Sequence, residues 1–138
     1  IAHSTVVYVY ETDEKAMQVA RNRAARANQG FKPPQREGES FEELLERYTE
    51  PYKKRGDLKS IETRLNLFNA DYIFENQVMF VGSPDTVAQQ IMSASKIGLF
   101  NTFMGEFNFA DLPEEDLMRS IRLFAEGVIP VLKAFEPY

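Results

Sequence analysis

The chain contains no cysteine and only one histidine, His3. Without cysteine there can be no disulfide framework, no thiolate nucleophile and no cysteine-ligated metal. A single histidine is too few for a histidine zinc site or a Ser-His-Asp triad. We therefore expect no metal centre of these kinds.

Long apolar runs and an excess of positive charge are also missing. No stretch approaches the ~20 apolar residues of a transmembrane helix, and no signal peptide is visible, so we expect a cytoplasmic chain with no membrane partner. The sequence has 16 Lys and Arg against 21 Asp and Glu, a net charge of −5. It has no basic stripe to neutralise phosphates, so nucleic acid is not an expected partner.

The composition is that of a single globular domain. The chain has 138 residues, of which 43% are hydrophobic and 27% charged, and this is typical of folded rather than disordered chains. It opens with Ile1 instead of an initiator Met and enters an apolar strand almost at once. We therefore expect a piece of a longer protein.

Two segments indicate strands that lead directly into helices. Residues 4–10 are apolar, β-branched and aromatic, which suits a strand buried on both faces. Thr12 then predicts a helix N-cap, and alanines at three- and four-residue spacing predict a helix to about Asn28. In the second segment, residues 78–81 form a short apolar run before Gly82. Ser83 as N-cap and Pro84 at the first helical position predict a helix that ends at Gly98.

Residues 30–77 form an insertion between these segments. It is far longer than the ~2–6 residues usual for such a connection, and we interpret it as a lid or substrate loop. A polar loop over 32–39 precedes a capping box of Ser40 and Glu43. We expect Pro51 to limit this helix, and a second helix over 57–68 to face inward with three apolar residues, Ile61, Leu65 and Phe68. Residues 69–77 show no clear period.

The C-terminal part predicts one more strand and one more helix. Residues 99–105 read as the strand and 106–110 as a loop. Asp111, with Glu114 three residues later, predicts the helix start. An apolar stripe continues to Leu132, and Pro130 inside it predicts a kink or break near Gly127.

Three segments, in this order, resemble the C-terminal part of the bacterial luciferase-like flavin-dependent monooxygenases. They are residues 82–87 (Gly-Ser-Pro-Asp-Thr-Val), residues 97–98 (Ile-Gly) and residues 120–130 (Ser-Ile-Arg-Leu-Phe-Ala-Glu-Gly-Val-Ile-Pro). Residues 9–16 (Val-Tyr-Glu-Thr-Asp-Glu-Lys-Ala) also resemble the strand-to-helix passage before that family's long insertion. The resemblance covers nearly all of the chain.

The resemblance implies a helix-rich α/β fold. The whole chain, 1–138, would be the C-terminal segment of a (β/α)8 TIM barrel, about its last two βα units, with a helical insertion over about 30–77. Full-length members bind reduced FMN or, in a related branch, F420. They use O2 to form a flavin peroxide that attacks a small organic substrate, and a flavin reductase is a candidate partner. We expect the isolated chain to be inactive.

Strand edges pose a physical problem for such a fragment. Two strands cannot close a barrel, so a lone segment would expose edges and apolar helix faces. We expect self-association or the remainder of the barrel to cover them. The alternatives are an F420-dependent oxidoreductase of the same fold and a non-catalytic self-associating module.

Candidate site residues follow from the position of chemistry in barrels, at the C-terminal ends of the strands. Glu106 and Asn108 are the polar candidates near a flavin or substrate, and Met104 and Phe107 are candidates for an apolar substrate pocket. The alternative is that Glu106 is a loop carboxylate, Asn108 a turn former, and Met104 and Phe107 ordinary packing residues. We assign no catalytic or cofactor-binding residue.

Further polar groups have both a functional and a structural interpretation. Basic residues of the insertion are candidates to close over an anionic substrate or cofactor phosphate, or they form a solvated face: Arg36, Lys53, Lys54, Arg55 and Arg64. Ser83 is either an anion site at a helix N-terminus or only its cap. His3 is interpreted as structural.

Overall fold

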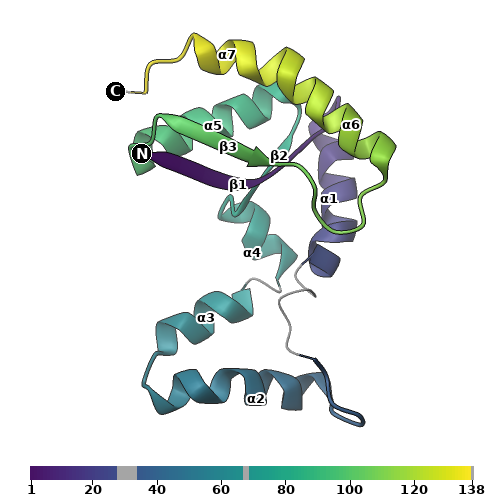
Figure 1. The fold of residues 1–138 in the computed structure, drawn as a ribbon, viewed down its shortest axis with the longest axis vertical. Coiled ribbons are helices and arrows are strands. Elements are labelled where there is room, and N and C mark those ends of the chain that lie inside the picture. The colour runs from purple at the N-terminus through teal and green to yellow at the C-terminus, as the bar shows by residue number, and fades with distance from the viewer. Residues whose placement is uncertain (28–33, 67–68, 138) are drawn as a thin grey trace.

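A small parallel sheet lies among helices in the upper part of the view in Figure 1. The computed structural model describes residues 1–27, 34–66 and 69–137. The strands are β1 (Ala2–Val9), β2 (Met79–Gly82) and β3 (Thr102–Glu106), in the order β2-β1-β3. Both pairings are parallel, and the register places Val6 opposite Met79 on one side and opposite Glu106 on the other.

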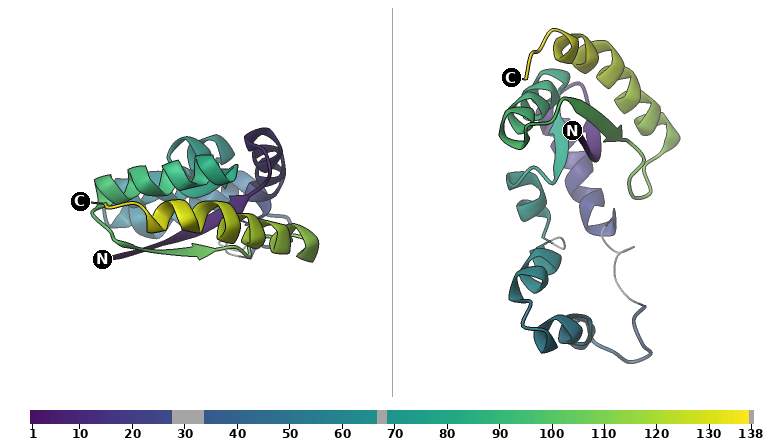
Figure 2. Two further views of the ribbon diagram at one scale, coloured as in Figure 1. Left: turned by 90° about the horizontal axis from the view of Figure 1, so that it is seen from above. Right: turned by 60° about the vertical axis from the view of Figure 1, so that its left-hand side comes forward.

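Helices flank this sheet on both faces and also form a separate arm. The helices are α1 (Asp13–Ala27), α2 (Phe41–Lys54), α3 (Leu58–Asn66), α4 (Ala70–Glu75), α5 (Pro84–Gly98), α6 (Glu114–Leu123), the π-helical η2 (Phe124–Val128) and α7 (Ile129–Lys133). The continuous rod α6-η2-α7 runs beside α5, whereas α2 and α3 lie apart from the sheet (Figures 1 and 2). No helix in the described ranges is long and apolar enough to cross a membrane.

Two apolar cores result from the alternation of side chains along β1. Val7 and Val9 pack with Phe80, with Val87 of α5 and with Val128 of η2. On the opposite face, Tyr8 packs with a second set from α1, α4 and the loop after β3: Ala16, Ala20, Ile73 and Phe109. The sheet is therefore covered by helices on both sides around the C-terminal half of β1.

The structure shows the expected α/β class but not a barrel. The α/β class, rich in helix with parallel strands, is confirmed. In a (β/α)8 barrel, however, strands that follow each other in sequence are neighbours and the helices form one outer ring. Here β1 lies between β2 and β3, and helices cover both faces. This arrangement is an open, doubly wound sheet.

Burial of the first strand is also less complete than expected. Val7, Tyr8 and Val9 are fully buried, but residues 2–4 are exposed. No helix among the described residues covers this first part of the sheet on the face that carries Met104, which is 54% exposed. The apolar sequence pattern predicted the strand but not how much of it is buried.

Most predicted helix starts are confirmed by their hydrogen bonds. The Ser40 and Glu43 capping box is complete, with both reciprocal bonds present. The hydroxyl of Ser83 accepts from the Thr86 N–H, with Pro84 in the first turn, and Thr12 Oγ1 accepts from the Lys15 N–H. The predicted end of the first helix, at Asn28, lies outside the described residues.

Two predictions in the helical regions were wrong, one helix was not predicted, and one helix end is confirmed. Pro51 lies inside α2, because a proline removes one helical bond without ending a helix held by other contacts. Residues 70–75 form α4, started by the Asn69 cap. α5 ends at Gly98 as predicted, and the residue after it, Leu99, takes the left-handed conformation. Asp111 does not cap α6, which begins after Pro113 without a side-chain cap.

The apolar face predicted for α3 is only partly formed. Ile61 is half-buried, whereas Leu65 is exposed. Phe68 lies outside the described residues. The helix packs mainly against α2, so one side of the pair remains open to solvent (Figure 2).

The break predicted from Pro130 takes the form of a π-helical turn. Pro130 has no N–H, and its ring crowds the carbonyl four residues earlier. The helix widens over Phe124–Val128 and resumes as α7. Gly127 lies in this turn, where an added Cβ would come within 2.5 Å of Pro84 Cβ. The turn therefore lets the last helix approach the start of α5.

Candidate functional site at the strand ends

The start of α5 is bonded to the start of α1. The Ser83 backbone N–H donates to Asp13 Oδ1 at 2.6 Å, and the Thr86 hydroxyl donates to Asp13 Oδ2 at 2.8 Å. A helix N-terminus is a natural anion site because its first N–H groups have no helical partner. In this chain the anion is the Asp13 carboxylate.

Gly82 permits this close approach. A Cβ at Gly82 would lie 2.7 Å from Thr86 Cγ2 and 2.8 Å from Asp13 Oδ1. The Ser83 N–H and the Thr86 hydroxyl stabilise the ionised carboxylate, so the pKa of Asp13 lies below its usual value. The cap interpretation of Ser83 is therefore supported, and its backbone N–H already has an acceptor.

The other side of the sheet end is closed by α6. The hydroxyl of Ser120, which is buried, accepts a 2.8 Å hydrogen bond from the Val9 N–H. Arg119 lies over the Tyr10 ring, 4.9 Å from its centroid. Its guanidinium also pairs with acidic groups on α6 and after β1: Asp116 at 2.8 Å, Glu115 at 3.4 Å and Glu11 at 3.8 Å. Arg119 thus joins α6 to the segment that leaves β1.

Tyr8 lies beneath this network. Its ring packs edge-on against Phe109, with centroids 5.6 Å apart, and its hydroxyl has no hydrogen-bond partner among the described residues. Burial, and next the negative charge of Asp116, raise the pKa of Tyr8 to about 12. The phenol therefore stays neutral at physiological pH and is a packing group here.

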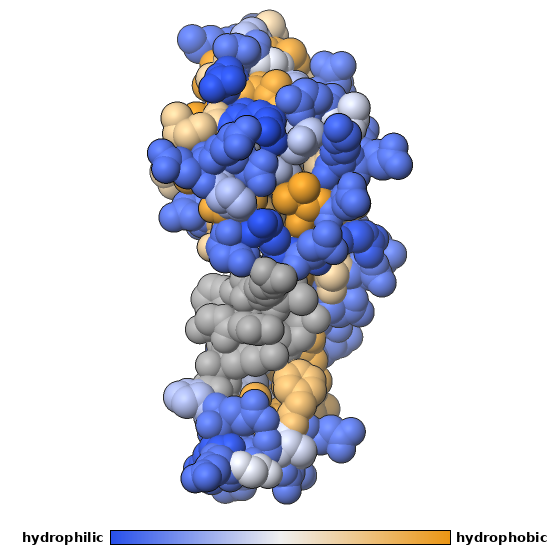
Figure 3. Space-filling view, turned by 90° about the vertical axis from the view of Figure 1, so that its right-hand side faces the viewer, coloured by the Kyte–Doolittle hydropathy of each residue, from blue (hydrophilic) through white to orange (hydrophobic). Residues whose placement is uncertain are grey.

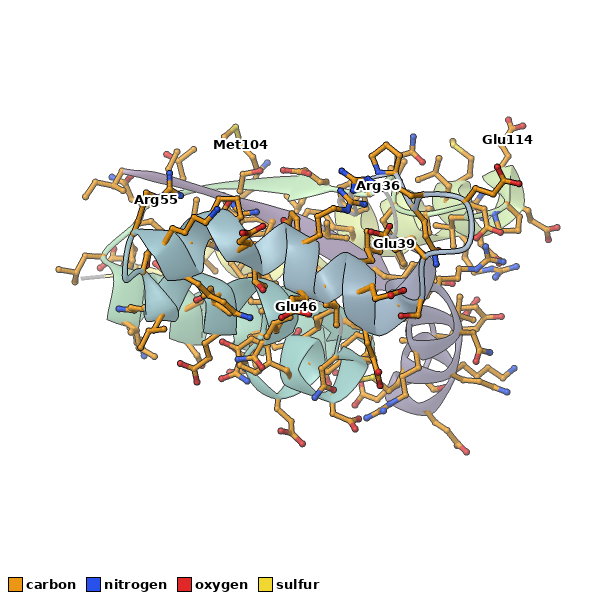
Figure 4. All side chains as sticks on the ribbon, turned by 90° about the horizontal axis from the view of Figure 1, so that it is seen from below. Arg36, Glu39, Glu46, Arg55, Met104 and Glu114 are labelled. Carbon is orange, nitrogen blue, oxygen red and sulfur yellow. The ribbon has the colours of Figure 1, made fainter. Side chains whose placement is uncertain are left out.

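The four predicted pocket residues do not converge. Met104 projects from the uncovered face of β3 (Figure 4), and Glu106 on that face accepts a 2.6 Å bond from the Ser4 hydroxyl. Phe107 packs into the opposite core, edge-on against Phe124 with centroids 5.0 Å apart. Asn108 is exposed. Their assignment to a substrate pocket stays a prediction for a larger protein.

The basic residues of the insertion interact within the arm itself. Arg47 binds both carboxylate oxygens of Glu39, at 2.7 and 2.9 Å, and this hydrogen bonding lowers the pKa of Glu39 to about 2. Arg64 donates to the Tyr48 hydroxyl at 2.6 Å and lies over the Tyr52 ring, as does Arg55. Lys54 pairs with Glu50 at 2.8 Å.

Arg36 and Glu39 approach each other at the start of the arm (Figure 4), where the Arg36 N–H donates to Glu39. Lys53 lines a shallow, mixed-charge hollow with Glu46 and Glu50. These contacts favour the solvated-face interpretation of the arm. The basic groups do not gather around a cavity at the strand ends.

Sequence reasoning missed the residues that join distant segments. Asp13 lies in the first turn of α1 and Arg119 lies on α6, and each connects two elements. Arg23 likewise donates to Asp111 at 2.7 Å across the same side of the molecule. That side is mostly hydrophilic (Figure 3). No periodicity signal reveals such pairs, because each depends on which strands become neighbours.

Among the described residues no group of His, Asp and Glu is placed to hold a metal ion. His3 stacks on the Phe100 ring with centroids 5.0 Å apart, which agrees with a structural role. No family model, curated protein or solved structure matches this chain in the comparisons with known proteins.

Proposed function

We propose that this chain is the C-terminal portion of an FMN-dependent, luciferase-like monooxygenase and is inactive in isolation. The support for the family is the ordered resemblance of residues 82–87, 97–98 and 120–130. The turn at the first of these segments has the features read from its sequence: a glycine with no room for a Cβ, a serine cap and a proline in the first turn.

One observation carries the proposal of inactivity. The Asp13 carboxylate accepts the hydrogen bond of the Ser83 N–H at the end of β2, so this backbone donor is not open to a flavin phosphate. A second anion at this position would be repelled by Asp13. The chain then contributes scaffold, and the cofactor contacts come from upstream units.

The proposal requires a different strand order in the complete protein. In a barrel β2 would lie between β1 and β3, and the helix that follows each strand would lie outside the barrel. The edge of β3 and the exposed Met104 would then be covered by other strands. An F420-dependent oxidoreductase of the same fold is the alternative for the complete protein.

Flavin titration tests the proposal. The 138-residue chain should not quench FMN fluorescence in a saturable way, whereas the protein from the full reading frame should bind FMN and consume O2 with reduced FMN. Binding of F420 by the full protein would select the alternative cofactor. A full protein that binds neither cofactor, or a 138-residue chain that binds reduced FMN tightly, would contradict the proposal.

The exposed end of the sheet favours a second candidate, a non-catalytic self-associating module. Apolar side chains gather near the starts of β1 and β3, where Ile1, Ile97 and Leu99 are 80%, 85% and 57% exposed. Pairing of two β3 edges would cover them. Light scattering on the same samples tests this module: a stable dimer of the 138-residue chain, dissociated by Met104→Glu, supports it, and a monomer contradicts it. Flavin binding by the full protein separates it from the monooxygenase candidate.

A further inference from the structure

An apolar cavity of about 310 Å³ lies between α5 and α7, beside the start of β3. This is at the opposite end of the sheet from Asp13 and Arg119. The volume falls within the ~300–1,000 Å³ typical of small-molecule pockets. Its walls are aromatic and aliphatic, formed by Phe103, Phe124 and Phe135 with Ile91, Ile129 and Leu132.

The polar groups at this cavity are donors and cations. Lys133, in the last turn of α7, lines it, and Lys96 Nζ lies 5.6 Å from the centroid of the Phe135 ring. Asn101 Oδ1 accepts from the nitrogen of Ile1 at 3.2 Å, which leaves its side-chain amide donors for another partner. Ser95 already donates to the Phe100 carbonyl. None of the described lining residues is acidic.

This charge pattern runs against that of the whole chain, which carries −5. An acidic protein repels anions in general, so a cavity whose described lining holds Lys133 and no carboxylate is a local exception. Helix C-termini favour nearby cations, which explains part of the placement of Lys96 and Lys133. It does not explain why Lys133 lines an apolar cavity whose wall residue Phe135 also contacts Lys96.

We propose that this cavity binds a small organic anion with an apolar body, namely an aryl or medium-chain acyl carboxylate. The body packs on the phenylalanine rings, and the carboxylate lies at Lys133 and the Asn101 amide. The proposal does not depend on the monooxygenase assignment, because none of its residues belongs to the strand-end site.

Calorimetric titration with naphthoate and its neutral analogue naphthamide tests this ligand class on the 138-residue chain. Wild-type protein should bind naphthoate more tightly than naphthamide. Lys133→Met keeps the apolar stem and should weaken naphthoate binding about three- to fivefold, as expected for a partly exposed ion pair, with naphthamide unchanged. Lys59→Met, on the distant α3, is the matched control and should change neither affinity.

Two further measurements locate the site. Nuclear Overhauser contacts from naphthoate should reach the Phe124 ring and the Leu132 methyl groups in wild-type protein. The cavity-filling Ile129→Trp should abolish binding while its urea unfolding midpoint shows that it folds. Equal affinity for the two ligands, equal effects of the two lysine variants, or contacts elsewhere would each overturn the proposal.

Discussion

At the scale of single residues, Asp13 has the most consequential position. One carboxylate satisfies donors from two different residues and belongs to a helix on the other face of the sheet. Its role is that of an N-cap supplied by a distant segment, so its loss should cost about as much as the loss of a good cap.

We expect Asp13→Ala to lower the free energy of unfolding by about 1–2 kcal/mol at neutral pH. The pKa of Asp13 is lowered in the folded state, so its contribution is present above its usual pKa of about 3.9 and is lost as the pH falls through the lower folded value. The difference between variant and wild type should therefore shrink in acid.

Urea unfolding at neutral pH and near pH 3 measures this difference. Glu14→Ala is the matched control, because Glu14 is also a first-turn acid of α1 but makes no hydrogen bond to α5 among the described residues. A variant difference that is as large in acid as at neutral pH would show that Asp13 acts through something other than its charge.

At the scale of elements, the π-helical turn determines how the last helix meets α5. The place of Gly127 against Pro84 leaves no space for a methyl group. Gly127→Ala should therefore destabilise the protein by about 1–3 kcal/mol, as overpacking of a well-filled contact usually does, even though alanine favours helices more than glycine.

The midpoint of urea unfolding measures this change. Glu126→Ala, at an exposed position of the same turn, is the control and should have little effect. If Gly127→Ala stabilised the chain, helix propensity would outweigh the contact with Pro84, and the close packing would have to be looser than described.

Local sequence signals predicted where helices begin better than they predicted which contacts those helices make with distant segments. Ser40, Ser83 and Thr12 start helices through bonds within a few residues, and these were readable from the sequence. Asn69 caps a helix too short to show a period, so α4 was missed. Asp111 was misassigned because the sequence cannot show that Arg23, 88 positions earlier, bonds to it.

At the scale of the whole molecule, the order of the strands separates this chain from a barrel. Because the chain has no cysteine, a disulfide formed in a variant with two introduced cysteines must join those two residues. Such variants therefore test the strand order. Ala2 and Thr102 are opposite each other across β1 and β3, and Val6 and Met79 across β1 and β2.

We expect the pair Ala2→Cys with Thr102→Cys to form a disulfide in the 138-residue chain, since paired strands bring Cα atoms within bridging range. In a complete barrel β1 and β3 are separated by β2, so the same pair should remain reduced there. Val6→Cys with Met79→Cys should cross-link in both proteins and serves as the positive control. Non-reducing electrophoresis reads out each result. Cross-linking of the first pair in the full protein would exclude the barrel order.

The candidate site could be predicted only as a location. Strand ends were expected to carry polar groups, and they do, but the sequence did not reveal that Asp13 and Arg119 bond to neighbouring elements there. The apolar cavity between α5 and α7 gave no sequence signal at all. Its walls come from β3 and two helices that meet only once the sheet is assembled.

The central position of β1 has a consequence for how the protein is made. β1 leaves the ribosome before both of its neighbours, and Ser4 of β1 bonds to Glu106, which lies 102 residues later in the chain. Until then the segment that becomes the middle of the sheet has no partner on either edge. Contacts so distant in sequence are slow to form, and unpaired apolar strands invite aggregation. The nascent chain therefore passes through an interval in which its central strand is unprotected along both edges.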